Sequence, residues 1–299
     1  VKTHAQAVVI GGGVIGCSIL YHLAKLGWSD VILIERSELT SGSTWHAAGG
    51  FHTLNGDTNM AALQSYTIRL YKELEEITGM SCGLHHVGGV TLADNQERFD
   101  MLLAERAKHR YMGLETEIVG PDEIKKIAPL TNINGLVGGL YDPLDGHLDP
   151  SGTTYAYAKA ARMGGAEIET NTIVVQTNQR TDGSWDIVTD KSTVHAEHLV
   201  NAGGLWAREV VSMAGLYLPL HPMEHQYIVT DDIAEIYERD NEHPHVMDPS
   251  GESYLRQEGR GLCIGFYEQN CKPWAVSGTP WDFGHELLVD DFSKINDSI

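Results

Sequence analysis

A glycine-rich turn near the N-terminus has the spacing of a dinucleotide-binding loop. Residues 11–16 read Gly-Gly-Gly-Val-Ile-Gly, a G-x-G-x-x-G pattern that follows the apolar run 7–10 and opens a segment of helical periodicity. In such a loop Gly11 makes the tight turn, Gly13 lets a pyrophosphate approach the backbone, and Gly16 lets the helix pack on the strand. The free N–H groups at the helix N-terminus favour a phosphate. The pattern predicts a dinucleotide site but does not separate FAD from NAD.

An acidic residue stands where such a site needs one. Glu35 ends the second apolar run, 31–34, and lies 19 residues after Gly16. A carboxylate at this point accepts hydrogen bonds from the hydroxyls of an adenosine ribose and repels a 2′-phosphate. We therefore expect the site not to take NADP.

A second candidate segment follows at residues 41–50, which read Ser-Gly-Ser-Thr-Trp-His-Ala-Ala-Gly-Gly. Small residues flank one aromatic side chain and one histidine, so a bulky ligand can approach this backbone closely. From the residues alone, His46 is a ligand contact, a base or a bystander on a loop.

Together these segments resemble the dimethylglycine and sarcosine dehydrogenases, a family of D-amino-acid-oxidase-like flavoproteins. The resemblance covers nearly the whole chain, and the Trp-His-Ala sequence is its most specific part. It implies a mixed α/β fold with a Rossmann-like FAD-binding domain interleaved with a sheet-rich substrate domain. We expect the first domain from 1–80 and 145–215, and the second from 81–144 and 216–299. The segments that carry the resemblance are 8–13, 33–36, 43–49, 145–150, 200–210, 225–230, 254–257 and 265–268.

The resemblance also implies the residues that contact FAD. In this family the histidine of the Ser-Thr-Trp-His-Ala segment is attached covalently to the 8α-carbon of FAD, and here that residue is His46. The implied contacts are Gly11, Gly13, Val14, Ile15 and Gly16 at the pyrophosphate, Glu35 and Arg36 at the ribose, Gly42, Ser43, Thr44, Trp45, His46, Ala47, Ala48, Gly49 and Gly50 around the flavin, Val174 at the adenine, and Trp206 after the next glycine turn.

Two further residues resemble the family's substrate-side groups. They are His225 in the His-Gln-Tyr segment and Tyr254 before the Leu-Arg segment. Hydride leaves an N-methyl carbon only when the amine lone pair is free, and histidine titrates in the range needed to take the ammonium proton. Tyr254 can hold the substrate carboxylate or orient the base, or it is an ordinary buried strand residue. Arg256 is an alternative carboxylate partner because of its bidentate fork.

No metal site is expected from the sequence. The two suggestive groups, Cys82 with His85 and His86, and His243 with His245, each lack a second matched pair. No Cys-x-x-Cys occurs among the four cysteines, so a zinc ribbon or dithiol motif is not expected, and a reducing compartment is the default.

The elements that must position these residues can be inferred from periodicity. Apolar runs at 7–10 and 31–34 flank a helical pattern over 14–26, which predicts a parallel strand–helix–strand unit. Helices are predicted over 59–78, 95–112, 122–127 and 151–163, and strands over 88–93, 172–178, 185–189, 198–204, 226–230, 253–256 and 261–267.

Composition excludes several classes of protein. The 299 residues are 42% hydrophobic and 21% charged, which is typical of a globular chain of about two domains. The net charge of −20 makes nucleic acid and anionic membranes poor partners. There is no apolar run of ~18 residues and no signal sequence. We expect a cytoplasmic protein if the source is bacterial, or one of the mitochondrial matrix if it is eukaryotic.

The predicted function is FAD-dependent removal of an N-methyl group from a small N-methylated glycine. The flavin would then be reoxidised by an electron-transfer flavoprotein or by oxygen. The family's closing glycine-rich segment and its C-terminal folate-binding module have no counterpart here, so the chain is expected to be an N-terminal fragment, and tetrahydrofolate is expected only with that module. The alternatives are a non-catalytic relative, such as a regulatory subunit of pyruvate dehydrogenase phosphatase, and an NAD-dependent Rossmann dehydrogenase.

Overall fold

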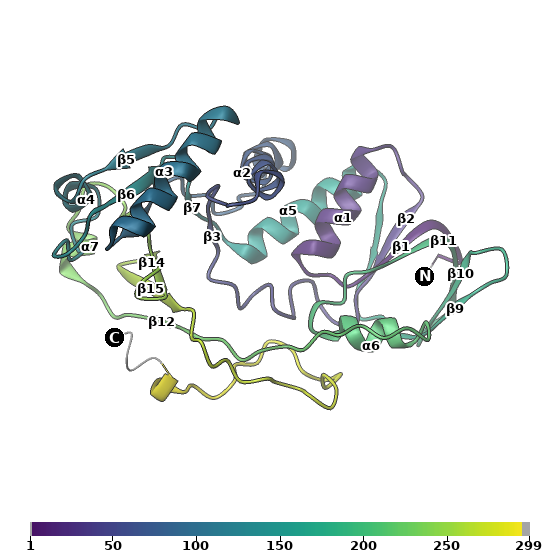
Figure 1. Cartoon of the computed structure of the whole chain (residues 1–299). Helices are drawn as coiled ribbons and strands as arrows, with labels where there is room; N and C mark the ends of the chain where they lie inside the picture. The colour runs from purple at the N-terminus through teal and green to yellow at the C-terminus, as the bar shows by residue number, and fades with distance from the viewer. Residues whose placement is uncertain (1, 295–299) are drawn as a thin grey trace.

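The computed structural model of the chain describes residues 2–294 and is built around two large β-sheets. Figure 1 places the six-stranded sheet at one end of the molecule and the seven-stranded sheet at the other, with helices α1, α5 and α2 between them. These helices are α1 (Val14–Lys25), α2 (Thr58–Thr78) and α5 (Pro150–Met163). No helix in residues 2–294 is both long enough and apolar enough to cross a bilayer.

The six-stranded sheet contains the predicted strand–helix–strand unit. Its order is β8 (Glu167–Glu169), β2 (Val31–Ile34), β1 (His4–Ile10), β11 (Thr193–Asn201), β10 (Trp185–Thr189) and β9 (Val174–Gln179). The first four strands are parallel and the last two continue as an antiparallel meander. Strands β1 and β2 are buried on both faces, which explains their unbroken apolar runs.

Helices α1 and α5 cover one face of this sheet. Cys17, Leu20 and Tyr21 of α1 recur at helical spacing and pack with Tyr157 of α5 on Leu33. The opposite face packs a separate cluster that includes residues of the β9–β10 meander. Helix α1 ends one residue earlier than the sequence predicts.

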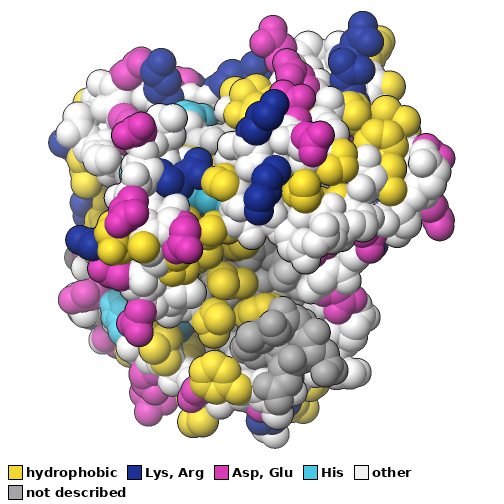
Figure 2. All heavy atoms as spheres, turned by 90° about the vertical axis from the view of Figure 1, so that its left-hand side faces the viewer, with side chains coloured by type: hydrophobic (Ala, Val, Ile, Leu, Met, Phe, Trp, Pro, Cys, Tyr) yellow, Lys and Arg dark blue, Asp and Glu magenta, His cyan; other side chains and the backbone are white. Residues whose placement is uncertain are grey.

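The seven-stranded sheet is mostly antiparallel. Its order is β12 (Tyr227–Val229), β15 (Gly261–Phe266), β14 (Ser253–Glu258), β13 (His245–Asp248), β4 (Gly89–Ala93), β6 (Gly138–Asp142) and β5 (Glu117–Val119). Helices α3 (Gln96–Tyr111), α4 (Pro121–Ile127) and α7 (Ala234–Tyr237) lie at this end of the molecule (Figure 1). On the face shown in Figure 2, acidic and basic side chains are interspersed, and hydrophobic side chains gather in a hollow near its centre.

The chain passes between the two sheets several times. Every strand of the six-stranded sheet lies in 1–80 or 145–215, and every strand of the seven-stranded sheet lies in 81–144 or 216–299. A two-stranded ribbon lies where segments 48–53 and 145–149 meet. It pairs β3 (Gly50–Phe51) with β7 (Gly146–His147), and the remaining elements are η1 (Gly204–Trp206), α6 (Ala207–Ser212) and η2 (Phe292–Lys294).

Helix ends follow ordinary capping chemistry. The Asp57 side chain accepts hydrogen bonds from the N–H groups of Asn59 and Met60 and so begins α2, which ends at Gly79 with a φ of 65°.

The strand predicted at 198–204 begins earlier, at Thr193, because it pairs with β10 as well as with β1. Six short strands have no counterpart among the sequence predictions: β3, β5, β6, β7, β8 and β13.

Candidate functional site

A cavity of about 470 Å³ lies at the carboxyl ends of β1, β2 and β11, beside the N-terminus of α1. This is the edge of an open α/β sheet at which ligands bind. Twelve of the predicted cofactor contacts line it: Gly11, Gly13, Val14, Ile15, Glu35, Arg36, Gly42, Ser43, Thr44, Ala47, Val174 and Trp206.

The turn before α1 is a cradle that only glycine allows. Gly11 has a φ of 111°, and a Cβ there would overlap the carbonyl of Ala202. Gly13 begins α1 with no side-chain cap, and a Cβ on it would lie 3.0 Å from Oγ1 of Thr44. That hydroxyl accepts a hydrogen bond from the N–H of Val14 at 3.0 Å. The exposed backbone at a helix N-terminus fits a pyrophosphate.

Glu35 is buried at the end of β2 and holds this turn in place. Its Oε2 accepts a hydrogen bond from the N–H of Gly12 at 2.6 Å, and its Oε1 accepts one from the N–H of Ser37 at 2.9 Å. Each carboxylate oxygen has a further lone pair, so Glu35 can still accept from ribose hydroxyls. The glycine cradle and Glu35 together fit the adenosine diphosphate part of FAD.

Arg36 and Trp206 form one side of the cavity. The Arg36 guanidinium lies 4.0 Å from the centre of the Trp206 ring, and it donates hydrogen bonds to the carbonyls of Trp281 and Phe283. Burial lowers the pKa of Arg36. Trp281 also lines the cavity, and nothing in the sequence marks it for this role beyond its being an aromatic residue in an acidic tail.

The other six predicted cofactor residues do not line this cavity. They are Gly16, which packs α1 on the turn, and Trp45, His46, Ala48, Gly49 and Gly50 of the loop. His46 lies between two carbonyls, with Nδ1 3.0 Å from the oxygen of Gly42 and Nε2 2.7 Å from that of Glu286. A neutral imidazole donates to only one of them. The Trp45 ring lies beside it, with ring centroids 4.1 Å apart.

The two predicted substrate-side residues, His225 and Tyr254, are gathered around Tyr267. The Tyr267 ring lies 6.0 Å from His225 and 5.5 Å from Tyr254 between centroids. Nδ1 of His225 lies 3.1 Å from Oε2 of Glu268, whose side chain is only 7% exposed. Burial raises the pKa of Tyr254 to about 12, so its phenol stays protonated at neutral pH. Sequence reasoning did not assign roles to Tyr267 and Glu268.

Each nitrogen of the Arg256 guanidinium already has a partner within the protein, which leaves few N–H donors for a substrate carboxylate. Arg256 donates from Nε to the carbonyl of Ala48 and from Nη1 to that of Gln257 at 2.8 Å, and Nη2 is 2.7 Å from Oε2 of Glu258. Its side chain therefore ties the loop of His46 to strand β14. We assign it a positioning role rather than that of a carboxylate ligand.

Two buried histidines lie close to this loop. His245 of β13 lies against Gly50, because a Cβ on that glycine would be 3.2 Å from Nε2 of His245. Neither ring nitrogen of His245 has a hydrogen-bond partner within residues 2–294. Burial and the nearby His52, His147 and Arg256 lower the pKa of His245 to about 3. Burial, Arg256 and His85 lower that of His147 to about 4. Both imidazoles are therefore uncharged at neutral pH.

Comparisons with known proteins bear on the family and the fold of the chain. The model of the DAO family, FAD dependent oxidoreductase, matches residues 6–293. The mitochondrial dimethylglycine dehydrogenase of Mus musculus is 42% identical over the whole chain, and the mitochondrial sarcosine dehydrogenase of Homo sapiens is 38% identical over 94% of it. The mitochondrial pyruvate dehydrogenase phosphatase regulatory subunit of Mus musculus is 32% identical over 92%.

The matched region is one part of each relative. The chain spans 35% of the dimethylglycine dehydrogenase, and 31% each of the sarcosine dehydrogenase and the phosphatase subunit. Among solved structures, L-proline dehydrogenase from P. horikoshii superposes with a TM-score of 0.85 at 26% identity, covering 100% of this chain and 76% of that one. The D-amino-acid-oxidase-like fold predicted from the sequence is therefore confirmed.

Proposed function

This chain belongs to the FAD dependent oxidoreductase family, and from that premise we propose that it is the flavin-binding and substrate-binding part of an N-demethylating dehydrogenase or oxidase. The proposed substrate is dimethylglycine or sarcosine. The observation that carries the proposal is the cradle formed by the glycine turn, Glu35 and the adjoining cavity. The similarity to dimethylglycine and sarcosine dehydrogenases supports amine oxidation as its chemistry.

When bound, FAD would supply the hydride acceptor. We propose that His46 anchors it covalently. If Nδ1 donates its proton to the Gly42 carbonyl, the lone pair lies on Nε2. Attachment through Nε2 then requires this nitrogen to leave the carbonyl of Glu286, which lies 2.7 Å away.

The His225–Glu268 pair has the geometry of an oriented base. A carboxylate that accepts from Nδ1–H leaves the Nε2 lone pair available for a proton. We propose that Nε2 takes the ammonium proton of the substrate, so that the amine lone pair assists loss of hydride from the N-methyl carbon. The protonated phenol of Tyr254 donates a hydrogen bond to the substrate carboxylate.

The resulting iminium would then react without further help from His225, Glu268 or Tyr254. Addition of water gives the demethylated amine and formaldehyde, or the carbon passes to tetrahydrofolate if a folate-binding module is present in the whole protein. An electron-transfer flavoprotein or oxygen is the proposed acceptor for the electrons. A mitochondrial matrix location is proposed for a eukaryotic source and a cytoplasmic one for a bacterial source.

A substrate panel on the full-length holoprotein tests this function. Under anaerobic conditions dimethylglycine or sarcosine should bleach the visible flavin absorption, and addition of water to the resulting iminium should yield formaldehyde in the same mixture. Glycine, which lacks the N-methyl group, is the matched control and should leave the flavin oxidised. Bleaching by glycine at the same rate, or by neither N-methylated compound, would count against the proposal.

The second candidate function is a regulatory subunit without redox activity, which the 32% identity to the phosphatase regulatory subunit favours. Such a protein would keep the fold and lose flavin turnover. A holoprotein that binds FAD but is reduced by none of the panel, and that changes the activity of a partner phosphatase, would establish this alternative.

A further inference from the structure

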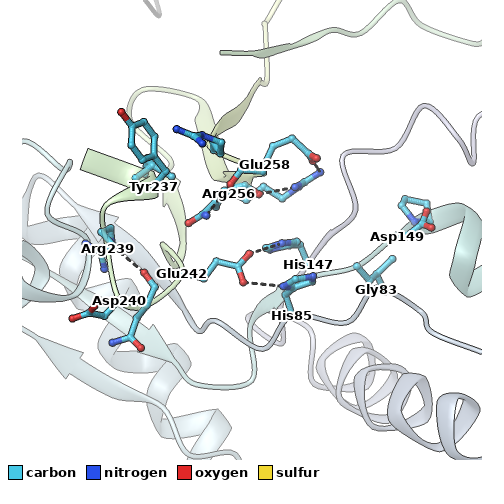
Figure 3. Close-up of a pocket in the computed structure, with 17 residues that line it drawn as sticks. Gly83, His85, His147, Asp149, Tyr237, Arg239, Asp240, Glu242, Arg256 and Glu258 are labelled. Atoms are coloured by element: carbon cyan, nitrogen blue, oxygen red, sulfur yellow. Dashed lines mark hydrogen bonds and ion pairs between the residues drawn. The ribbon is translucent and has the colours of Figure 1, made fainter. Parts of the chain in front are cut away.

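A second cavity, of about 670 Å³, lies apart from the cofactor cavity and shares no lining residue with it. Its walls come from segments 83–85, 147–150, 236–242 and 256–260, so both sequence halves of the fold contribute (Figure 3). Cavities between two parts of a chain are common ligand sites.

Three side chains of metal-binding type converge on this cavity. Oε2 of Glu242 lies 2.8 Å from Nδ1 of His85, and Oε1 lies 3.1 Å from Nε2 of His147. In Figure 3 the Glu242 carboxylate points at both imidazoles from the opposite wall. The three ligand atoms lie within 4.8 Å of one another.

The backbone holds the two histidines side by side. The N–H of His85 donates to the carbonyl of His147 at 2.8 Å, and the N–H of His147 donates back at 3.1 Å. This isolated bridge places both side chains on the same face, where the rings stack with centroids 4.8 Å apart. His147 is buried and lines the cavity, so its ring is held at the wall where the group meets.

We propose that His85, His147 and Glu242 bind a divalent transition-metal ion of the Zn²⁺ type, with water from the cavity completing the coordination. Two imidazoles and one carboxylate with an open position form a zinc donor set. Bonds of ~2.0–2.1 Å at tetrahedral angles place ligand atoms about 3.3 Å apart. The present distances of 2.8 and 3.1 Å join the two imidazoles to different oxygens of Glu242, so they show that the three side chains lie within reach of one ion before any side chain turns.

One side chain must turn for the ion to enter. The two rings are stacked at an interplanar angle of 8°, so a single ion cannot lie in both ring planes. The His147 side chain is held by burial, whereas that of His85 is 49% exposed and borders the cavity, so His85 is the ring that turns. Glu242 lies on the segment after α7, whereas His85 precedes β4 and His147 precedes α5. A shared ion would therefore link the wall formed by segment 236–242 to the wall formed by segments 83–85 and 147–150.

A second group, His225, Glu268 and Cys271, also brings three ligand types together. We assign no ion there, because His225 is the base of the proposed reaction and its nitrogen cannot serve both roles. The His85 group has no part in that chemistry, so its test is independent of the proposed function.

The experiment is a Zn²⁺ titration of the chelator-treated full chain by calorimetry, with X-ray absorption at the zinc edge. We expect one tightly bound ion per chain with two imidazole ligands. Glu242→Gln and His85→Gln should each weaken binding by at least about tenfold, because removal even of outer partners costs ~10–100-fold. His86→Gln, which changes the adjacent histidine outside the group, is the matched control and should leave the affinity unchanged.

Circular dichroism of every variant separates lost binding from lost folding. A folded Glu242→Gln protein that binds Zn²⁺ as tightly as the parent would overturn the proposal. Absence of a bound ion in the folded parent, or a zinc spectrum without imidazole ligands, would also overturn it and would leave the three side chains as a hydrogen-bonded network.

Discussion

Substitution of Gly16 by alanine is expected to damage the cofactor cradle by a calculable amount. A Cβ on Gly16 would lie 1.9 Å from the carbonyl oxygen of Gly11, whereas ordinary contacts are 3.4 Å or longer, so the two must separate by about 1.5 Å. Overpacking of this kind costs ~1–3 kcal/mol. The opposing atom is backbone, and Cβ of Ala202 lies 3.4 Å from the added Cβ, so we expect the upper end of this range. Alanine gains back ~1 kcal/mol of helix propensity, which leaves a net loss of about 2 kcal/mol.

The assay compares thermal unfolding and FAD binding in matched variants. A loss of about 2 kcal/mol should lower the melting temperature by roughly 3 °C, because an unfolding entropy of ~2.1 cal/mol/K per residue amounts to about 0.6 kcal/mol/K in a chain of 299 residues. The glycine turn should also move away from the helix N-terminus, so FAD binding should weaken. A loss of 1.4 kcal/mol corresponds to a factor of ten, so we expect binding to weaken by about tenfold or more. Gly56→Ala is the control, because its Cβ would meet only Oε1 of Glu105 at 3.7 Å. A Gly16→Ala protein with unchanged melting and FAD affinity would refute the packing argument.

Three further predictions concern charge and protons. Glu35→Gln should weaken FAD binding by roughly 10–100-fold, because one of the N–H groups of Gly12 and Ser37 loses its acceptor at a cost of ~1–3 kcal/mol; titration of the apoprotein with FAD checks this, and equal affinity would contradict it. His225→Gln should slow anaerobic flavin reduction by ~10²–10⁴-fold with the flavin still bound, and stopped-flow traces with an unchanged rate across pH would remove His225 from the mechanism. Folding stability should fall as the pH is lowered from 7.5 to 5. The folded-state pKa of His245 is about 3 and that of His147 about 4, against 6.5 for free histidine, so the unfolded chain binds more protons in that window. Each group should contribute a loss of about 2 kcal/mol at pH 5. Denaturant unfolding at both pH values measures the loss, and His245→Gln should reduce it; a slope that is the same in parent and variant would contradict the assignment.

The sequence was most informative where local chemistry decides the structure. The strand–turn–helix unit around Gly11 is specified by apolar runs and glycines, and the structure places it where the pattern predicts. Helix α2 begins one residue before its predicted start, because Asp57 caps it. These features depend on neighbours within a few residues along the chain.

The features that the sequence did not predict arise from contacts between distant segments. Glu242 meets His85 and His147 only after the fold brings three segments together, so no spacing rule along the chain detects the group. Trp281 lines the cofactor cavity, and its backbone carbonyl accepts a hydrogen bond from Arg36, a residue far away along the chain. The short strands β5, β6, β8 and β13 gain their pairing from partners elsewhere in the sheets, and their sequences carry too few residues to show a period.

We propose that this cradle holds FAD, which would accept hydride from an N-methyl carbon of the substrate. The most direct measurement is the kinetic isotope effect on anaerobic flavin reduction of the full-length protein by dimethylglycine. Deuterium in the N-methyl groups should slow reduction by a primary isotope effect, while deuterium in the methylene group next to the carboxylate should not. A primary effect from the methylene position alone would show that the other carbon is oxidised and would contradict the account.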